Sequence, residues 1–90
     1  MKFLHTDVGP RQAGDVVEVT ISSVANVRLM DTNNFNFYKN GMKHIYTGGL
    51  VRQSPIRLTI PTVGHWHVAI DLNGVQGSTG LKAGVKVVAA

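Results

Sequence analysis

Apolar and polar residues alternate strictly along much of this 90-residue chain, and this pattern restricts the possible folds more than any other feature. A period of two places successive side chains on opposite faces of a strand, so each alternating segment predicts a strand with one buried face. The apolar positions recur in this way in Val17–Ile21, Val27–Leu29, Ile56–Ile60, Trp66–Leu72 and Leu81–Val87.

Two further segments, Phe3–Val8 and Ile45–Val51, are weaker strand candidates because their alternation is broken. Glycine and proline favour turns, because glycine permits positive φ and proline fixes φ near −65°. Such pairs separate the apolar segments at Gly9-Pro10, Gly14-Asp15, Ser54-Pro55, Val63-Gly64 and Asn73-Gly74. The sequence therefore predicts an all-β fold, an antiparallel β-sandwich of about seven to eight short strands, with residues 1–90 as a single domain.

The segment near residues 32–41 does not follow the strand pattern. Thr32 is a candidate cap for a short helical turn, with Phe35, Tyr38 and Met42 at positions i, i+3 and i+7 and Gly41 near its end. Four asparagines between residues 33 and 40 favour an ordered loop equally well, because asparagine competes for backbone hydrogen bonds. One short helical turn or an ordered loop is expected here.

Composition excludes several classes of protein. The chain has no cysteine, which excludes a disulfide scaffold, a thiolate metal site and a cysteine nucleophile. No apolar run has the length of a signal peptide or of a membrane span, so we expect a cytoplasmic protein without a membrane partner. Only five acidic residues are present, which disfavours catalysis by paired carboxylates.

The net charge of +4 comes from the middle of the chain, because no acidic residue lies between Asp31 and Asp71. Five of the six aromatic residues share this stretch with four lysines and arginines, a mixture that suits an anionic ligand. We expect a non-enzymatic recognition module without a cofactor, which binds a protein or an anionic ligand through segment 33–46 and neighbouring Arg52. The candidate ligand-binding residues are Asn34, Phe37, Tyr38, Lys39, Lys43 and Arg52.

Two other partners stay open for the same segment. Nucleic acid is less favoured than protein, because nucleic-acid-binding domains usually carry more positive charge than this chain. A homo-oligomer, formed with a second copy of the chain, is the other alternative.

A metal-dependent enzyme that uses His65 and His67 is the alternative hypothesis. Residues two apart on a strand project from the same face, so these two imidazoles can bind one metal ion. A catalytic zinc site needs a third protein ligand, for which His5, His44 and Asp71 are candidates. The competing interpretation is a pair of half-exposed histidines on the solvent face of an antiparallel sheet.

Several runs of the chain resemble a small bacterial family of domains of unknown function. They are Met1–Gly9, Gly14–Val19, Asn26–Asp31, Asn34-Phe35 and Gly64–Trp66. The resemblance implies an all-β domain of about this length and no defined reaction. In some relatives the domain is joined to a Toll/interleukin-receptor-like domain, which implies recognition rather than catalysis.

Overall fold

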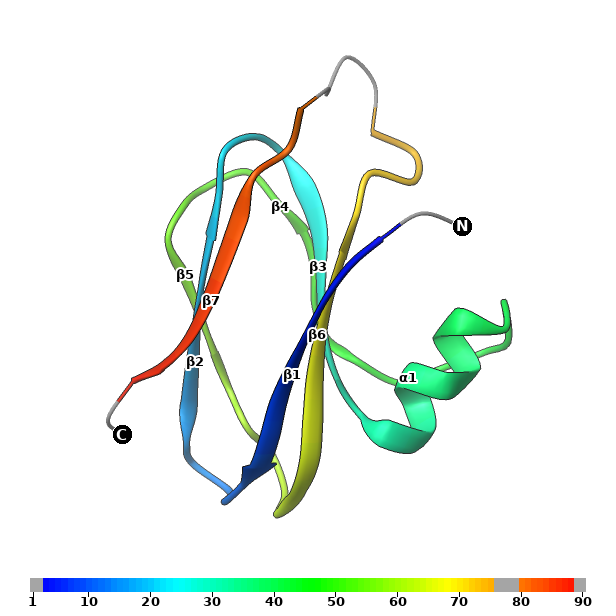
Figure 1. The fold of residues 1–90 in the computed structure, drawn as a ribbon, viewed down its shortest axis with the longest axis vertical. Coiled ribbons are helices and arrows are strands. Elements are labelled where there is room, and N and C mark those ends of the chain that lie inside the picture. Colours follow the sequence, from blue (N-terminus) through cyan, green and yellow to red (C-terminus); the bar gives the residue numbers. More distant parts are fainter. Residues whose placement is uncertain (1–2, 76–79, 89–90) are drawn as a thin grey trace.

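Two antiparallel sheets stack face to face in the computed structural model, which describes residues 3–75 and 80–88 (Figure 1). The four-stranded sheet has the strand order β1-β6-β3-β4, and the three-stranded sheet has the order β5-β2-β7. The strands are β1 (Leu4–Arg11), β2 (Val16–Ile21), β3 (Ala25–Asp31), β4 (Thr47–Val51), β5 (Ile56–Thr59), β6 (Gly64–Asp71) and β7 (Ala83–Val88), and a short helix α1 (Thr32–Lys39) follows β3. The predicted β-sandwich is confirmed.

The core lies between the two sheets and consists of the alternating apolar residues. Its fully buried members come from both sheets and include Val17, Val19, Val27, Leu29 and Val68. The predicted alternation is therefore confirmed for the central strands, whose inner positions belong to one hydrophobic core. Along the edge strand β7 it holds only in part, because Val85 packs against the core whereas Val87 is exposed.

β1 departs from the sequence prediction at Gly9 and Pro10, which lie inside the strand and not in a turn. Asp7 pairs with His67 and Gly9 pairs with Trp66, so Val8 is an extra residue in a β-bulge. Gly9 has φ +82°, a conformation that glycine adopts without strain. Proline is tolerated here because β1 is an edge strand, where a missing N–H need not break the sheet.

Segment 32–41 contains a true helix whose cap differs from the predicted one. Asp31 is the N-cap residue, since its Oδ1 accepts a hydrogen bond from the Asn34 N–H at 2.9 Å. The prediction that Thr32 caps the helix is wrong, because β3 continues to Asp31 in extended backbone and Thr32 is already the first helical residue. The helix ends at Lys39 with Asn40 as its C-cap, and Gly41 follows with φ +71° and donates its N–H to the Tyr38 carbonyl oxygen.

α1 lies against the outer face of the four-stranded sheet (Figure 1). Its buried residues Phe35 and Tyr38 pack against Met30 of β3 and Ala69 of β6, and Phe3 adds an edge-on ring contact with each of the two rings. Met42, which was expected on the same helical face, lies beyond the helix end and is exposed. In the described part of the chain, no helix has the length and apolar character to span a membrane.

The pairing of β4 with β3 generates a prediction at Gly48. A Cβ atom at this position would lie 2.2 Å from the Val27 carbonyl oxygen, whereas a Cβ at Gly49 would meet nothing within 4 Å. Both glycines have positive φ, so Gly49→Ala is a matched control for backbone strain. We expect Gly48→Ala to lower the free energy of unfolding by about 1–3 kcal/mol more than Gly49→Ala, the size of an overpacking penalty. Urea denaturation of both variants measures this, and equal losses would contradict the β3–β4 register.

Candidate functional site

Polar and titratable side chains gather on the outer face of the four-stranded sheet, partly beneath α1. His65, His67, Ala69 and Asp71 share this face, as their alternation with the core residues of β6 predicts. The interpretation of this face as a solvent face is wrong for His67 and Asp71, which are only 7% and 3% exposed. They are buried because a helix, which the alternation of the strands does not reveal, packs over this face.

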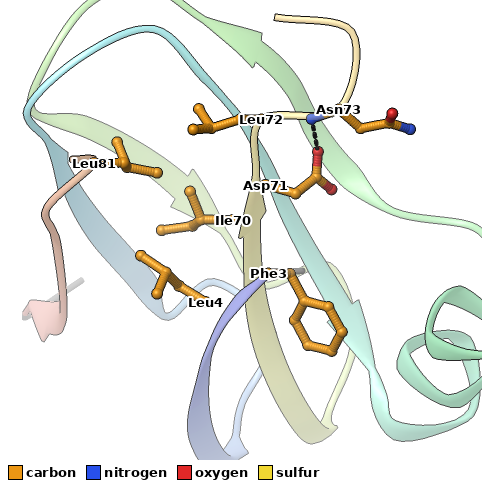
Figure 2. Close-up of a pocket in the computed structure, with 7 residues that line it drawn as sticks. All are labelled: Phe3, Leu4, Ile70, Asp71, Leu72, Asn73 and Leu81. Carbon is orange, nitrogen blue, oxygen red and sulfur yellow. Dashed lines mark hydrogen bonds between the residues drawn. The ribbon is translucent and has the colours of Figure 1, made fainter. Parts of the chain in front are cut away.

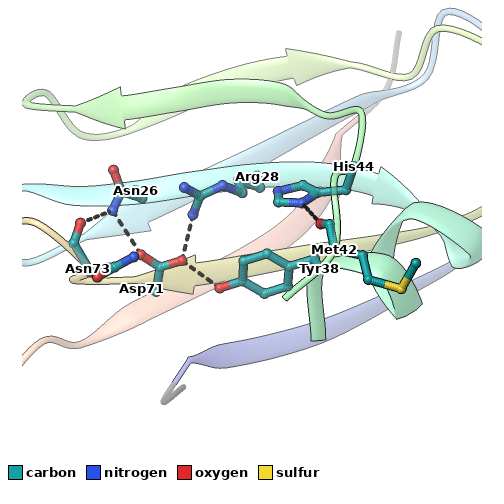
Figure 3. A network of polar contacts seen from close by, with 7 residues as sticks. All are labelled: Asn26, Arg28, Tyr38, Met42, His44, Asp71 and Asn73. Carbon is teal, nitrogen blue, oxygen red and sulfur yellow. Dashed lines mark hydrogen bonds and ion pairs between the residues drawn. The ribbon is translucent and has the colours of Figure 1, made fainter. Parts of the chain in front are cut away.

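Asp71 is the centre of a polar network that joins α1 to the sheet (Figure 3). Its Oδ2 accepts hydrogen bonds from the Tyr38 hydroxyl and from Arg28 Nη1, each at 2.5 Å. Its Oδ1 accepts from Asn26 Nδ2 at 2.8 Å and from the Asn73 backbone N–H at 3.0 Å. We call Asn26, Arg28, Tyr38 and Asp71 the Asp71 network.

The protonation states in this network follow from its donors. Burial alone would raise the pKa of Asp71, but hydrogen bonds from Tyr38, Asn26 and the Asn73 backbone, with the Arg28 charge, hold it below its ordinary value of 3.8. Burial raises the pKa of Tyr38, and its hydrogen bond to Asp71 raises it further. Asp71 is thus an ionised acceptor and Tyr38 a protonated donor, so the network anchors α1.

Three histidines and one aspartate form a second group, beside the first turn of α1. His65 Nε2 lies 2.6 Å from Asp7 Oδ1, and His67 Nδ1 lies 2.9 Å from His5 Nε2. The ring centroids of His65 and His67 are 5.0 Å apart. We call His5, Asp7, His65 and His67 the histidine cluster.

α1 fixes the orientation of the buried ring in this cluster. The Phe35 ring stacks on His5 at 4.2 Å and on His67 at 4.7 Å between centroids. Thr32 Oγ1 lies 2.8 Å from His67 Nε2, so both ring nitrogens of His67 have hydrogen-bond partners. His67 is therefore held in one orientation from two sides.

The charges of the cluster follow from its environment. Burial lowers the pKa of both His5 and His67, in opposition to the nearby Asp7 charge, which raises it. The hydrogen bond from His65 lowers the pKa of Asp7. At neutral pH the cluster thus holds neutral imidazoles at His5 and His67 beside an ionised carboxylate, which are the forms that bind metal ions.

Of the three candidates for a third metal ligand, the structure places only His5 in contact with His67. His5 contacts His67, but Asp71 belongs to the Asp71 network, and the His44 ring packs 5.2 Å from that of Tyr38. The carboxylate nearest to His65 and His67 is Asp7, which the sequence analysis missed. The available sign in the sequence was that Asp7 lies two residues after His5 and so shares a strand face with it. Only the pairing of β1 with β6 brings Asp7 opposite His67.

The predicted ligand-binding residues are only partly brought together. Phe37, Lys39 and Lys43 are exposed on α1 and the loop that follows it, whereas Tyr38 is buried beneath the helix. Asn34 holds the loop, because its Oδ1 accepts a hydrogen bond from the Ile45 N–H at 2.8 Å.

Arg52 does not neighbour these residues. It follows Val51, which pairs with Ala25 at the start of β3, whereas α1 follows the end of β3. The expectation that Arg52 lies beside segment 33–46 is wrong, because β4 carries the chain to the other end of the sheet.

The described residues line a larger and a smaller hollow on the surface. The larger, about 840 Å³, has mostly apolar walls, and its one carboxylate, Asp71, already has four hydrogen-bond partners (Figure 2). It is lined by Phe3, Leu4, Ile70, Asp71, Leu72, Asn73 and Leu81. A smaller cleft of about 250 Å³ lies beside Asn34, Ile45 and Tyr46 and extends to Trp66.

These features define a class of protein, a β-sandwich with a helix packed on the outer face of one sheet. A family described as "Domain of unknown function (DUF1883)" matches residues 1–90, and the chain belongs to this family. The resemblance to a family of small domains of unknown function is thereby confirmed, and the family description assigns no activity. No curated protein and no solved structure matches the chain.

Replacement of Asp71 by asparagine tests the anchoring network. Asp71→Asn leaves the largely buried Arg28 guanidinium without its anion, so we expect a loss of about 2–4 kcal/mol in the free energy of unfolding at pH 7. Because the folded-state pKa of Asp71 lies below its ordinary value of 3.8, its carboxylate stabilises the fold above that pH and ceases to do so as pH falls below it. The stability difference between wild type and Asp71→Asn should therefore shrink below pH 3.8. Urea denaturation across pH measures this difference, and a pH-independent difference would argue against an ionised Asp71.

Proposed function

We propose that this protein is a non-enzymatic binding module that recognises an acidic segment of a partner protein. The proposed contact surface is the α1–β4 segment, residues 33–46, which lies between β3 and β4. One observation carries the proposal: exposed apolar and cationic side chains share this segment, and no acidic residue occurs from 32 to 70. These side chains are Phe37, Lys39, Met42, Lys43, Ile45 and Tyr46.

The apolar side chains of the segment suit a protein interface. Phe37, Met42, Ile45 and Tyr46 are exposed large hydrophobic residues, and aromatic residues and methionine are enriched in interfaces. Burial of one such side chain contributes about 1.5–3 kcal/mol, before the cost of association is subtracted. Four of them within ten residues supply the apolar part of a binding surface. The cleft beside Ile45 and Tyr46 adds a concave region to this surface.

The charge of the segment favours an acidic protein over nucleic acid. Lys39 and Lys43 are exposed, and no carboxylate within the segment neutralises them. Arg28, the next cation along β3, is already paired with Asp71. Lys39 Nζ lies 4.9 Å from the centroid of the Phe35 ring and stays exposed, so Lys39 and Lys43 together complement a short acidic segment. Nucleic-acid binding usually needs a larger basic patch.

The segment is also ordered before any partner binds. The Asp31 cap, the Gly41 helix end and the hydrogen bond from the Ile45 N–H to Asn34 fix its backbone. Pre-ordering favours affinity because less conformational entropy is lost on association. Residues 33–46 contain no carboxylate, thiol or hydroxyl of serine or threonine, which supports binding rather than catalysis.

Photo-crosslinking in cells of the native host tests the proposal. A photoreactive phenylalanine analogue replaces Ile45, which is 77% exposed, and in a matched control replaces Val63, which is 67% exposed and lies outside the segment. We expect position 45, but not position 63, to crosslink to one protein through an acidic stretch, identified by mass spectrometry. Crosslinks to nucleic acid, to a second copy of the chain, or equally from both positions would contradict the proposal.

The affinity of the crosslinked partner then separates apolar from charge contributions. Phe37→Ala and Lys43→Ala should each weaken binding about tenfold or more, which corresponds to about 1.4 kcal/mol, whereas the control Val63→Ala should not. Binding should also weaken as salt rises, because the lysine contacts are screened. Fluorescence anisotropy of a labelled acidic peptide from the partner measures both effects. If Phe37→Ala bound the peptide as tightly as wild type, the assigned surface would be contradicted.

A further inference from the structure

The histidine cluster lies on the outer face of the sheet and takes no part in the function proposed above. We propose that Asp7, His65 and His67 bind one divalent transition-metal ion of the zinc type, through one carboxylate oxygen and two imidazole nitrogens. One candidate ligand atom from each residue lies within 4.8 Å of the other two.

The separations suit a tetrahedral ion after small movements of exposed side chains. Bonds of about 2.0–2.1 Å in a tetrahedral zinc site place ligand atoms roughly 3.4 Å apart. His65 Nε2 and Asp7 Oδ1, now 2.6 Å apart, share a hydrogen bond, and the ion would take the place of the shared proton. Both side chains are about half exposed and can rotate, whereas the buried His67 is fixed.

Neighbouring groups orient two of the three ligands in advance. The Gly9 N–H at the β1 bulge donates to Asp7 Oδ1 at 2.8 Å and holds the carboxylate beside β6. Phe35 stacks on the His67 ring, and Thr32 Oγ1 lies 2.8 Å from its Nε2, so the ion would bind Nδ1 in place of the hydrogen bond between Nδ1 and His5 Nε2. Hydrogen bonds of this kind to a ligating imidazole fix its orientation in metal sites.

The ligand set selects the class of ion. Imidazole favours zinc, copper and nickel, whereas calcium and magnesium require more oxygen ligands than one carboxylate supplies. Three protein ligands leave a fourth coordination position for water. His5 Nε2, which lies 2.9 Å from His67 Nδ1, is a further nitrogen beside the proposed ion. Lys39 is the nearby cation that opposes metal binding, but it is exposed and therefore screened.

Isothermal titration calorimetry, with ZnCl₂ added to chelator-stripped protein that has no histidine tag, tests the proposal. We expect one zinc ion per chain, and at least tenfold weaker binding by His65→Gln and by Asp7→Asn. Both residues are exposed, so the variants should fold, and circular dichroism checks this. His44→Gln, which removes a histidine outside the cluster, is the matched control and should bind like wild type.

Nuclear magnetic resonance of the imidazole nitrogens locates the ion independently of affinity. Zinc should shift the ring-nitrogen signals of His65 and His67 and leave those of His44 in place. Absence of stoichiometric zinc binding, or equal affinity of His65→Gln, Asp7→Asn and His44→Gln, would overturn the proposal. Because the cluster and the α1–β4 segment share no proposed contact residue, this result does not depend on whether a protein partner is found.

Discussion

Asp71 is buried on the outer face of the four-stranded sheet, and a buried carboxylate is tolerated only where donors surround it. Its donors come from three parts of the chain: Arg28 and Asn26 of β3, Tyr38 of α1 and the backbone after β6. Since β3 and β6 are neighbouring central strands, the network ties the helix to the most rigid part of the sheet. The position of α1 on this face therefore depends on the ionised Asp71 together with the apolar packing of Phe35 and Tyr38 on the sheet.

Both proposed sites depend in turn on the position of α1. An isolated helix of eight residues is unstable in water, so packing on the sheet must stabilise it. Once it is docked, Phe35 covers the histidine cluster, while Phe37 and the following loop remain exposed to a partner. The two proposed sites thus lie on the connection between β3 and β4 and on the strands beneath it.

The sequence predicted the sandwich because its central strands have one face in a shared core, which enforces alternation at residues such as Val17 and Val68. It also predicted the position of the helix, since Phe35 and Tyr38 lie one turn apart and Gly41 lies just beyond the C-cap residue Asn40. Alternation assigns a residue to a face but does not show what covers that face. Apolar Met30 and Ala69, at outer positions between polar neighbours, were the available sign of a covering helix.

The candidate sites were less predictable because they depend on which strands are neighbours. His65 and His67 are on one strand, so their shared face followed from spacing alone. Asp7 joins them only through the β1–β6 pairing. A bulge shifts the register of this pairing after Asp7, and the Gly9-Pro10 pair at the bulge was interpreted as a turn. Arg52 was placed with the binding residues because it is close in sequence, but β4 separates it from them in space.

Both proposed sites require that α1 packs over the histidine cluster in solution. The most direct measurement is the nuclear Overhauser effect between the ring protons of Phe35 and those of His67. The ring centroids lie 4.7 Å apart, so we expect clear cross-peaks, with weaker or absent ones from Phe35 to His65. Absence of any Phe35–His67 cross-peak in the folded protein would contradict this packing.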